Sequence, residues 1–241
     1  MHIEVDTHTH TVLSGHAHST IMENAAAAAR LGLKGIVMTD HGPRIHAAPP
    51  DYNIGTYAYL PTHISGVRIY SGIEANIVDF EGSIDIRDRY LKQLDFAIAG
   101  MHEVVIDPGG KAKNTKAVIG ALNNKYVDII SHPDNPSYEL DYEAVIRETA
   151  RLGKLVEIND HSFEYRSGGI EIARVLLDLC SKHGVRVAVS SDAHSAFGIG
   201  KFNAAKQQLE INGFPESLIV NLTMERFEGY LDERTKRIEK A

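Results

Sequence analysis

Seven short apolar segments recur along the sequence, and each is followed by a stretch that could be helical. The segments are rich in Val and Ile, which is typical of buried strands. We expect strands at residues 3–7, 35–39, 67–73, 94–99, 127–131, 155–159 and 185–190. Near-continuous apolar strands of this kind belong to parallel sheets that are covered on both faces.

Helices are expected between the strands, at residues 21–31, 84–92, 115–124, 142–151 and 170–183, with a further helix outside the sheet in 215–241. Gly32, Gly153 and Gly184 each stand between a helical stretch and the next strand. A glycine in this place ends a helix by adopting a left-handed conformation. The repeated strand–helix order predicts an α/β protein with a parallel sheet.

Potential metal ligands follow six of the seven strands, immediately after each apolar run. They are His8, His10, His16, His41, Glu74, His102, His132, Asp192 and His194. A closed barrel brings many strand ends to one rim, whereas an open sheet gathers only two or three. We therefore predict a TIM-like (β/α)7 barrel, with residues 1–241 forming a single domain.

The spacing of these residues indicates a catalytic metal site. His8 and His10 lie two positions apart, so their side chains leave an extended strand from the same face, and Asp192 and His194 repeat that spacing. Asp6 shares it, and is expected to accept a hydrogen bond from a ligating histidine. Imidazole and carboxylate without sulfur suit zinc, manganese or iron in a catalytic centre.

Composition sets the outer limits of this interpretation. A chain of 241 residues with 43% hydrophobic content can bury the core of one domain. The single cysteine, Cys180, lies in an apolar helical run and is expected to be a buried apolar side chain. Because there is no signal-like segment and no long apolar run, we expect a soluble cytoplasmic protein with no membrane partner.

The formal net charge of −7 disfavours nucleic acid as a partner, because such binding needs clustered Lys and Arg. It does not exclude a small anionic substrate. Several divalent ions in one pocket would make that pocket positive regardless of the surrounding surface.

In these motifs the sequence resembles the PHP superfamily, named for polymerase and histidinol phosphatase. The motifs occur in order: His8-x-His10 with His16, Thr39-Asp40-His41-Gly42, Gly72-Ile73-Glu74, His102, Ser131-His132-Pro133 and Ser191-Asp192-Ala193-His194. The chain is most similar to the small stand-alone phosphatase branch. That resemblance implies a distorted seven-stranded barrel and a trinuclear centre, usually of zinc.

The resemblance also implies how the ligands divide among three ions. One ion would be bound by His8, His10, Glu74 and Asp192, a second by His16, His41 and His194, and a third by Glu74, His102 and His132. Glu74 would then bridge two ions, which a carboxylate can do through its two oxygens.

The leading hypothesis is hydrolysis of small phosphate monoesters by a metal-bridging hydroxide. Metal ions deliver hydroxide near neutral pH and neutralise charge on phosphoryl oxygens. Arg166, after the sixth strand, is a candidate phosphate clamp, with a solvated loop arginine as the alternative.

Asp192 or a metal-bound water could protonate the leaving group. His18 is a weaker candidate ligand, Arg44 and Lys201 are weaker candidate clamps, and His63 and His161 could contact substrate.

Three other functions stay open from sequence. One is a phosphodiesterase or nuclease of the same superfamily. Another is an amidohydrolase-type enzyme, which would require a carboxylated bridging lysine; no lysine ends a strand near the middle of the chain. The third is a non-catalytic metal-binding protein. The substrate and the native metals are not determined by the sequence, and a homo-oligomer is expected only from the resemblance.

Overall fold

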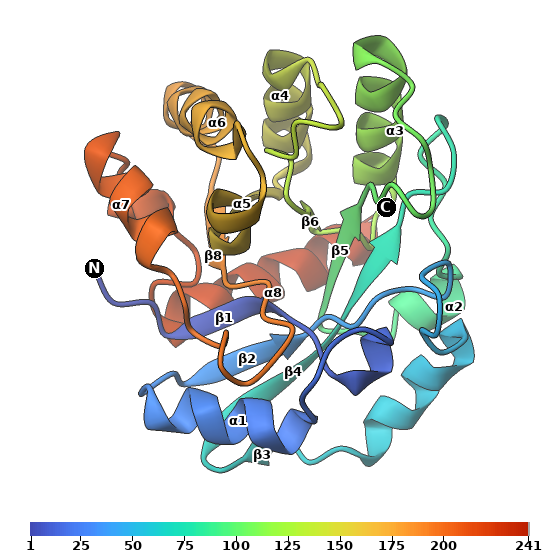
Figure 1. Cartoon of the computed structure of the whole chain (residues 1–241), viewed down its shortest axis with the longest axis vertical. Coiled ribbons are helices and arrows are strands. Elements are labelled where there is room, and N and C mark those ends of the chain that lie inside the picture. Colours follow the sequence, from blue (N-terminus) through green and yellow to red (C-terminus); the bar gives the residue numbers. More distant parts are fainter. Residues whose placement is uncertain (241) are drawn as a thin grey trace.

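The protein is described by a computed structural model, which covers residues 1–240 and has the expected alternation of strands and helices (Figure 1). Parallel strands pair in the order β1 (Val5–Thr9), β2 (Gly35–Met38), β4 (Val67–Asn76), β5 (Phe96–Gly100), β6 (Ile129–Ile130), β7 (Leu155–Asn159) and β8 (Val187–Ser190). A parallel bridge joins Thr9 to Ala193, and the amide of His10 donates to the carbonyl of Ala193 at 2.9 Å. These contacts bring the last strand back to the first, so the prediction of a distorted TIM-like (β/α)7 barrel is confirmed.

Helices cover the outside of the barrel. They are α1 (Ile21–Arg30), α2 (Asp88–Leu91), α3 (Lys111–Asn123), α4 (Tyr142–Leu152), α5 (Asp160–Tyr165), α6 (Gly169–His183) and α7 (Asn203–Ile211). Figure 1 shows α1 on one side of the strands and α3, α4 and α6 on the other. Ile36 and Ile158 of the strands pack with Leu176 of α6 in the largest apolar core. Burial of these apolar faces is what stabilises the helices against the sheet.

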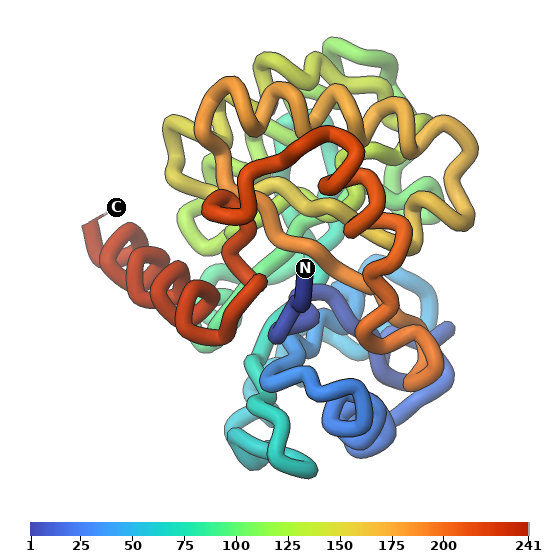
Figure 2. Tube along the Cα trace, turned by 90° about the vertical axis from the view of Figure 1, so that its left-hand side faces the viewer, coloured from blue at the N-terminus to red at the C-terminus, as the bar shows by residue number. Residues whose placement is uncertain are grey.

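The last helix, α8 (Met224–Lys240), closes the barrel at the end opposite the candidate ligands. Its Phe227 and Tyr230 are buried in one cluster with Val5 of β1, Phe96 of β5 and Ala188 of β8. In Figure 1 α8 runs behind the strands, and in Figure 2 it forms one edge of the molecule. The expected C-terminal helix is therefore present, and it seals one end of the barrel interior.

The expected helix at residues 84–92 is mostly wrong. Only α2 forms there, because Ile84 pairs with Ile77 in an antiparallel bridge and the carboxylate of Asp85 binds the backbone and side-chain amides of Asn76. The short strand β3 (His63–Ile64), the helices α5 and α7, and the 3₁₀ segments η1 (Val12–Ser14), η2 (Asp51–Tyr59) and η3 (Glu216–Leu218) were not expected.

Cys180 is fully buried in α6, as expected, and burial raises the pKa of its thiol to about 12. Among residues 1–240, none of the helices combines the length and apolar character needed to span a bilayer.

Candidate metal centre

All nine predicted ligands meet at the rim formed by the C-terminal ends of the strands. They surround a cavity of about 390 Å³, which is lined by all of them except His8 and His10. His8 and His10 lie beneath it, with no exposed surface. Since these residues come from six strand ends spread over most of the chain, only the closure of the barrel brings them together.

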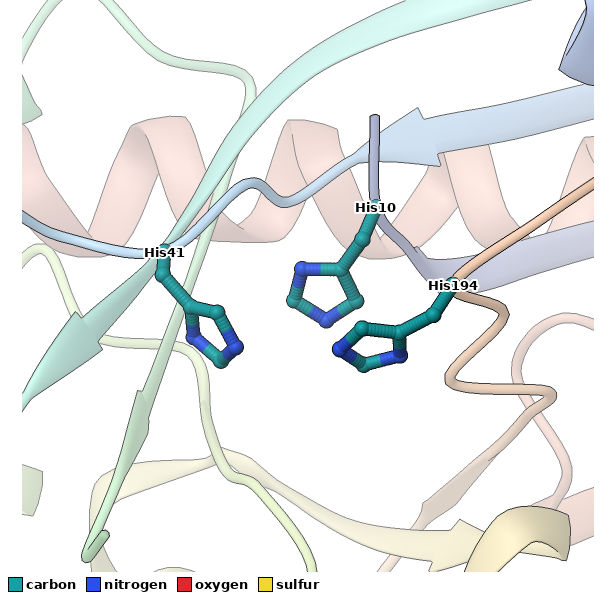
Figure 3. Close-up of side chains that lie close together, drawn as sticks. All are labelled: His10, His41 and His194. Carbon is teal, nitrogen blue, oxygen red and sulfur yellow. The ribbon is translucent and has the colours of Figure 1, made fainter. Parts of the chain in front are cut away.

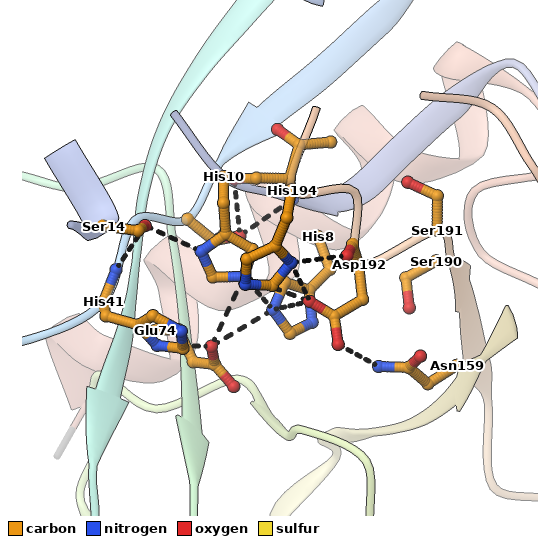
Figure 4. Close-up of polar contacts among 12 residues, drawn as sticks. His8, His10, Ser14, His41, Glu74, Asn159, Ser190, Ser191, Asp192 and His194 are labelled. Carbon is orange, nitrogen blue, oxygen red and sulfur yellow. Dashed lines mark hydrogen bonds and ion pairs between the residues drawn. The ribbon is translucent and has the colours of Figure 1, made fainter. Parts of the chain in front are cut away.

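Four donor atoms at the base of the cavity have the spacing of a tetrahedral metal site (Figure 4). Nε2 of His8 lies 2.9 Å from Nε2 of His10, 3.3 Å from Oε2 of Glu74 and 3.4 Å from Oδ1 of Asp192. Nε2 of His10 lies 3.5 Å from the same Glu74 oxygen and 3.1 Å from the same Asp192 oxygen. Ligands about 2.0–2.1 Å from a tetrahedral zinc ion lie about 3.3 Å from one another. An ion of this kind therefore fits between the four atoms.

A second group of imidazoles lies above the first. Nε2 of His194 is 3.0 Å from Nε2 of His16, and the rings of His16 and His41 stack with centroids 5.0 Å apart. Ligand atoms of His10, His41 and His194 all lie within 4.8 Å of one another, and Figure 3 shows the three rings pointing toward one space. The predicted grouping of His16, His41 and His194 is thus compatible with the geometry.

Glu74 stands between two groups of histidines and presents a different oxygen to each. Its Oε2 faces His8, His10 and Nδ1 of His41, the last at 2.9 Å. Its Oε1 faces Nε2 of His132 at 3.1 Å and Nε2 of His102 at 3.3 Å. This division is what a carboxylate that bridges two ions requires.

Gly100 makes room for the contact between Glu74 and His102. A Cβ at this position would collide with Oγ of Ser131 and would lie 3.0 Å from both Oε1 of Glu74 and Cε1 of His102. A larger residue would push the carboxylate away from the histidines, so the site needs glycine here.

Hydrogen bonds at Nδ1 direct Nε2 of His8 and His10 into the site. Nδ1 of His8 donates to Oε1 of Glu157 at 2.6 Å. Nδ1 of His10 donates to Oγ of Ser14, which in turn donates its only proton to Asp40 at 2.7 Å. Nε2 of each ring is therefore the nitrogen that faces the site, and a neutral ring binds a metal ion through it.

Three further histidines are oriented in the same way. Nδ1 of His102 donates to Oδ1 of Asn76 at 2.7 Å, while those of His16 and His194 donate to the backbone carbonyls of Ser14 and Asp192. A carbonyl oxygen can only accept, so it fixes the tautomer of its partner. Five rings thus direct Nε2, the nitrogen through which a neutral ring binds a metal ion, toward the same site.

The centre contains buried polar atoms that lie close together without forming aligned hydrogen bonds. Within residues 1–240, Oε2 of Glu74, Nδ1 of His41 and Nε2 of His102 are buried with no hydrogen-bond partner, although Glu74 lies 2.9 Å from His41 and 3.3 Å from His102. Although burial opposes ionisation, His8 and other histidines hold the pKa of Glu74 and of Asp192 well below their usual values, so both are carboxylates. Unpaired groups of this kind are costly in a protein interior unless a cation occupies the space between them.

Backbone strain accompanies the site. His132 and Asp192 have positive φ values of 33° and 51°, although neither is glycine. Residues in this conformation cluster at functional sites, where the surrounding structure holds them in place.

The prediction for Asp6 is wrong. Its carboxylate accepts from the amide and hydroxyl of Ser191 and from the amide of Gly200, and not from a histidine ring. The register of β1 is irregular between Asp6 and Thr9, which breaks the alternation that would have placed Asp6 with His8. Sequence reasoning missed Glu157, which accepts the hydrogen bond from His8 that was expected of Asp6. The sequence offered one signal for it: Glu157 is a carboxylate inside β7, the strand that supplies no predicted ligand.

Arg166 lines the cavity, as predicted, and its side chain is held by Ser162. Its guanidinium donates to Oγ of Ser162 at 2.5 Å, and Ser162 donates to Oδ1 of Asp134 at 2.9 Å. Ser162 and Asp134 are both buried. These hydrogen bonds hold the arginine in place, and among residues 1–240 its guanidinium contacts no carboxylate directly.

The other rim candidates divide into two groups. His18 and His161 line the same cavity, and Arg44 lines an adjacent one. Lys201 lines neither. The prediction that His63 contacts substrate is wrong, because β3 pairs with the first residues of β4, at the opposite end of the barrel.

The sequence of the chain matches the family model described as the PHP domain over residues 6–174. It is 42% identical to a protein of Acetivibrio thermocellus named a probable phosphatase, over 99% of both chains. It is 45% identical to another so named from Caldanaerobacter subterraneus subsp. tengcongensis, covering 99% of this chain and 94% of that one.

Among solved structures, the fold is similar to the histidinol phosphate phosphatase of Lactococcus lactis, crystallised with zinc, L-histidinol and phosphate. The TM-score is 0.61 at 16% identity, with 89% of this chain and 95% of that chain covered. The likeness in structure supports the barrel, and the family match covers every predicted ligand except Asp192 and His194. This chain belongs to the PHP domain family.

Proposed function

We propose that the protein is a metal-dependent phosphatase that hydrolyses small phosphate monoesters, with residues 1–241 acting as one metallohydrolase domain. One observation carries the proposal. The two oxygens of Glu74 face two separate groups of histidines, and hydrogen bonds at Nδ1 turn Nε2 of His8 and of His102 toward the carboxylate. The names of the similar proteins from Acetivibrio and Caldanaerobacter support the reaction class.

The proposed cofactor is zinc, with three ions per chain. One ion would be held by His8, His10, Glu74 and Asp192, a second by His16, His41 and His194, and a third by Glu74, His102 and His132. The zinc in the Lactococcus relative supports the choice of metal, while histidine and carboxylate would also accept manganese or iron.

When bound, such ions supply an activated water near neutral pH and neutralise negative charge on the phosphoryl group. The chain contributes orientation. Arg166, on the cavity wall next to His132, would bind phosphoryl oxygens through two N–H groups. Asp192 is a carboxylate whose Oδ1 faces Nε2 of His8 and His10 and whose Oδ2 accepts from Asn159 at 3.1 Å, so we assign it to ion binding and not to proton donation.

An amidohydrolase-type centre is less well supported. It would need a lysine as the bridging ligand, and within residues 1–240 no lysine lines the cavity, where Glu74 would fill the bridging place. Phosphodiester hydrolysis would use the same ions and is separated from the proposal by assay.

The test is release of inorganic phosphate from p-nitrophenyl phosphate by purified protein. We expect activity that a chelator removes and that zinc or manganese restores. Bis-p-nitrophenyl phosphate, a diester, is the comparison substrate. Hydrolysis of the diester alone, or activity that a chelator leaves intact, would contradict the proposal.

A further inference from the structure

A second cavity opens beside the metal centre and shares a wall with it. It has a volume of about 790 Å³, and His16, His41 and His102 line both spaces. Arg166 and His132 belong to the first cavity only. If the phosphoryl group lies between the ions and Arg166, then the rest of a substrate extends past these three histidines into the second cavity.

The far wall of this second cavity is formed by residues 43–48. This loop packs closely against the loop after β1: a Cβ on Gly15 would lie 2.8 Å from the carbonyl oxygen of His46 and 2.9 Å from Cβ of Ala47. Gly15 has a φ of 82° and Ala47 a φ of 68°. The two loops therefore hold each other in place, so the shape of this wall is fixed by their packing.

The charge of this wall is positive. Arg44 lines the cavity, together with His46, and no Asp or Glu does so within residues 1–240. Within the described residues, the hydrogen bonding of Arg44 is limited to its backbone amide, which donates to Asp85 at 3.0 Å. The carboxylate of Asp85 also binds the backbone and side-chain amides of Asn76, so its oxygens are engaged away from the guanidinium. The guanidinium of Arg44 thus has no partner in the described chain.

From this geometry we infer that the leaving group of the substrate carries its own negative charge, a carboxylate or a second phosphate, which Arg44 binds. Arginine recognises both groups through paired N–H donors. The same wall disfavours an amine-bearing leaving group such as L-histidinol, because like charges would face each other. This inference rests on the proposed phosphatase function and specifies its substrate class.

The experiment compares matched substrates that differ only in the charge of the leaving group. Glycerol 3-phosphate and 3-phosphoglycerate share a carbon skeleton and differ by a carboxylate, and fructose 6-phosphate and fructose 1,6-bisphosphate differ by a phosphate. L-histidinol phosphate provides the cationic case. We expect kcat/KM to be about tenfold higher for the anionic member of at least one pair, and lowest for L-histidinol phosphate. The pair that shows the preference identifies the anionic group.

Arg44→Met should bring the ratio within the preferred pair close to one, and Arg44→Glu should lower it below one. Lys201→Met is the control, since Lys201 is an exposed cation on the same rim that lines neither cavity, and its ratio should match that of the unaltered protein. A readout that does not depend on turnover is calorimetric binding of D-glycerate, which Arg44→Met should weaken. Melting temperatures verify that the exposed substitutions leave the fold intact.

Equal rates within both pairs, faster hydrolysis of L-histidinol phosphate, or a preference that survives in Arg44→Met would overturn the inference while leaving the phosphatase proposal standing. The proposed function itself fails if no monoester, including p-nitrophenyl phosphate, is hydrolysed in a metal-dependent way.

Discussion

Oε1 of Glu157 accepts a hydrogen bond from Nδ1 of His8 at 2.6 Å, and this contact turns Nε2 of His8 toward Glu74. The other oxygen of Glu157 accepts from the backbone amide of His132. One buried carboxylate in β7 therefore orients His8, in β1, and His132, which follows β6.

Glu157→Gln tests this role. The amide keeps the size of the side chain but loses the charge that holds the proton on Nδ1 of His8. Metal affinity or activity should fall by about 10- to 100-fold, as for other groups that orient metal ligands. Glu210→Gln, at an exposed site in α7, is the control and should behave as the unaltered protein. Equal metal affinity and turnover in both variants would show that Glu157 is only a buried structural residue.

Glu74→Gln should have a larger effect, because it removes the charge shared by two groups of histidines. We expect fewer metal ions per chain and a loss of turnover of at least about 100-fold. Elemental analysis of the dialysed variant beside the unaltered protein measures the first, and phosphate release measures the second. A full complement of metal in the variant would exclude Glu74 as a bridge.

Ser162→Ala should act only through Arg166. Without the hydroxyl the guanidinium loses its link to Asp134, so we expect a KM for phosphate esters raised by about tenfold and a smaller change in kcat. Arg166→Met should raise KM further, and adding Ser162→Ala to it should change nothing more, since the two residues form one unit.

The control for this pair is Ser167→Ala, which changes an exposed hydroxyl next to Arg166. If the effects of Ser162→Ala and Arg166→Met were simply additive, Ser162 would have a structural role that is independent of the arginine.

Gly100→Ala tests the packing around Glu74. The added Cβ meets Ser131 and crowds both Glu74 and His102, so the free energy of unfolding should fall by about 1–3 kcal/mol, together with the metal content. Gly229→Ala in α8 is the matched control, because nothing lies within 4 Å of its added Cβ. Chemical denaturation of the two variants gives the comparison, and equal stability would show that the interior has room to relax.

Lys154 makes stability depend on pH at a place far from the metal centre. Burial lowers the pKa of this lysine to about 7, and its Nζ donates to the carbonyls of Leu122 and Asn124 at the end of α3. Between about pH 7 and about pH 10.4 the unfolded chain holds a proton that the folded chain lacks, so this residue's contribution to stability rises with pH across that window.

Lys154→Met should remove this dependence. The free energy of unfolding of the unaltered protein should rise relative to that of the variant from pH 7 to pH 10, as measured by denaturant titration. Lys92→Met, at an exposed position, should give a difference that is constant with pH. A constant difference for Lys154→Met as well would mean that the lysine stays charged in the folded protein.

Much of the architecture could be predicted from sequence because apolar strand segments and helical segments alternate regularly along the chain. The apolar runs and the glycines at helix ends located all seven parallel strands, and ligand types at the strand ends indicated closure. The failures have local causes. Residues 84–92 have helical spacing, yet Asp85 binds Asn76 across a turn, and that contact depends on the tertiary fold.

The candidate site shows the same limit. The residues that face the cavity could be identified by type and place, but the groups that orient them could not. Glu157, Asn76 and Ser14 are separated from their histidines by strand pairing or by a loop, so their positions in the sequence do not show which histidine each one contacts. Asp6 has the right spacing, and a single irregularity in β1 gives it a different role.

Anomalous diffraction from crystals of the protein as isolated, measured above and below the zinc edge, would test the metal centre most directly. We expect strong peaks on both sides of the Glu74 carboxylate, one among His8, His10 and Asp192 and another beside His102 and His132. An absence of any peak within bonding distance of Glu74, in crystals supplied with zinc or manganese, would contradict the account.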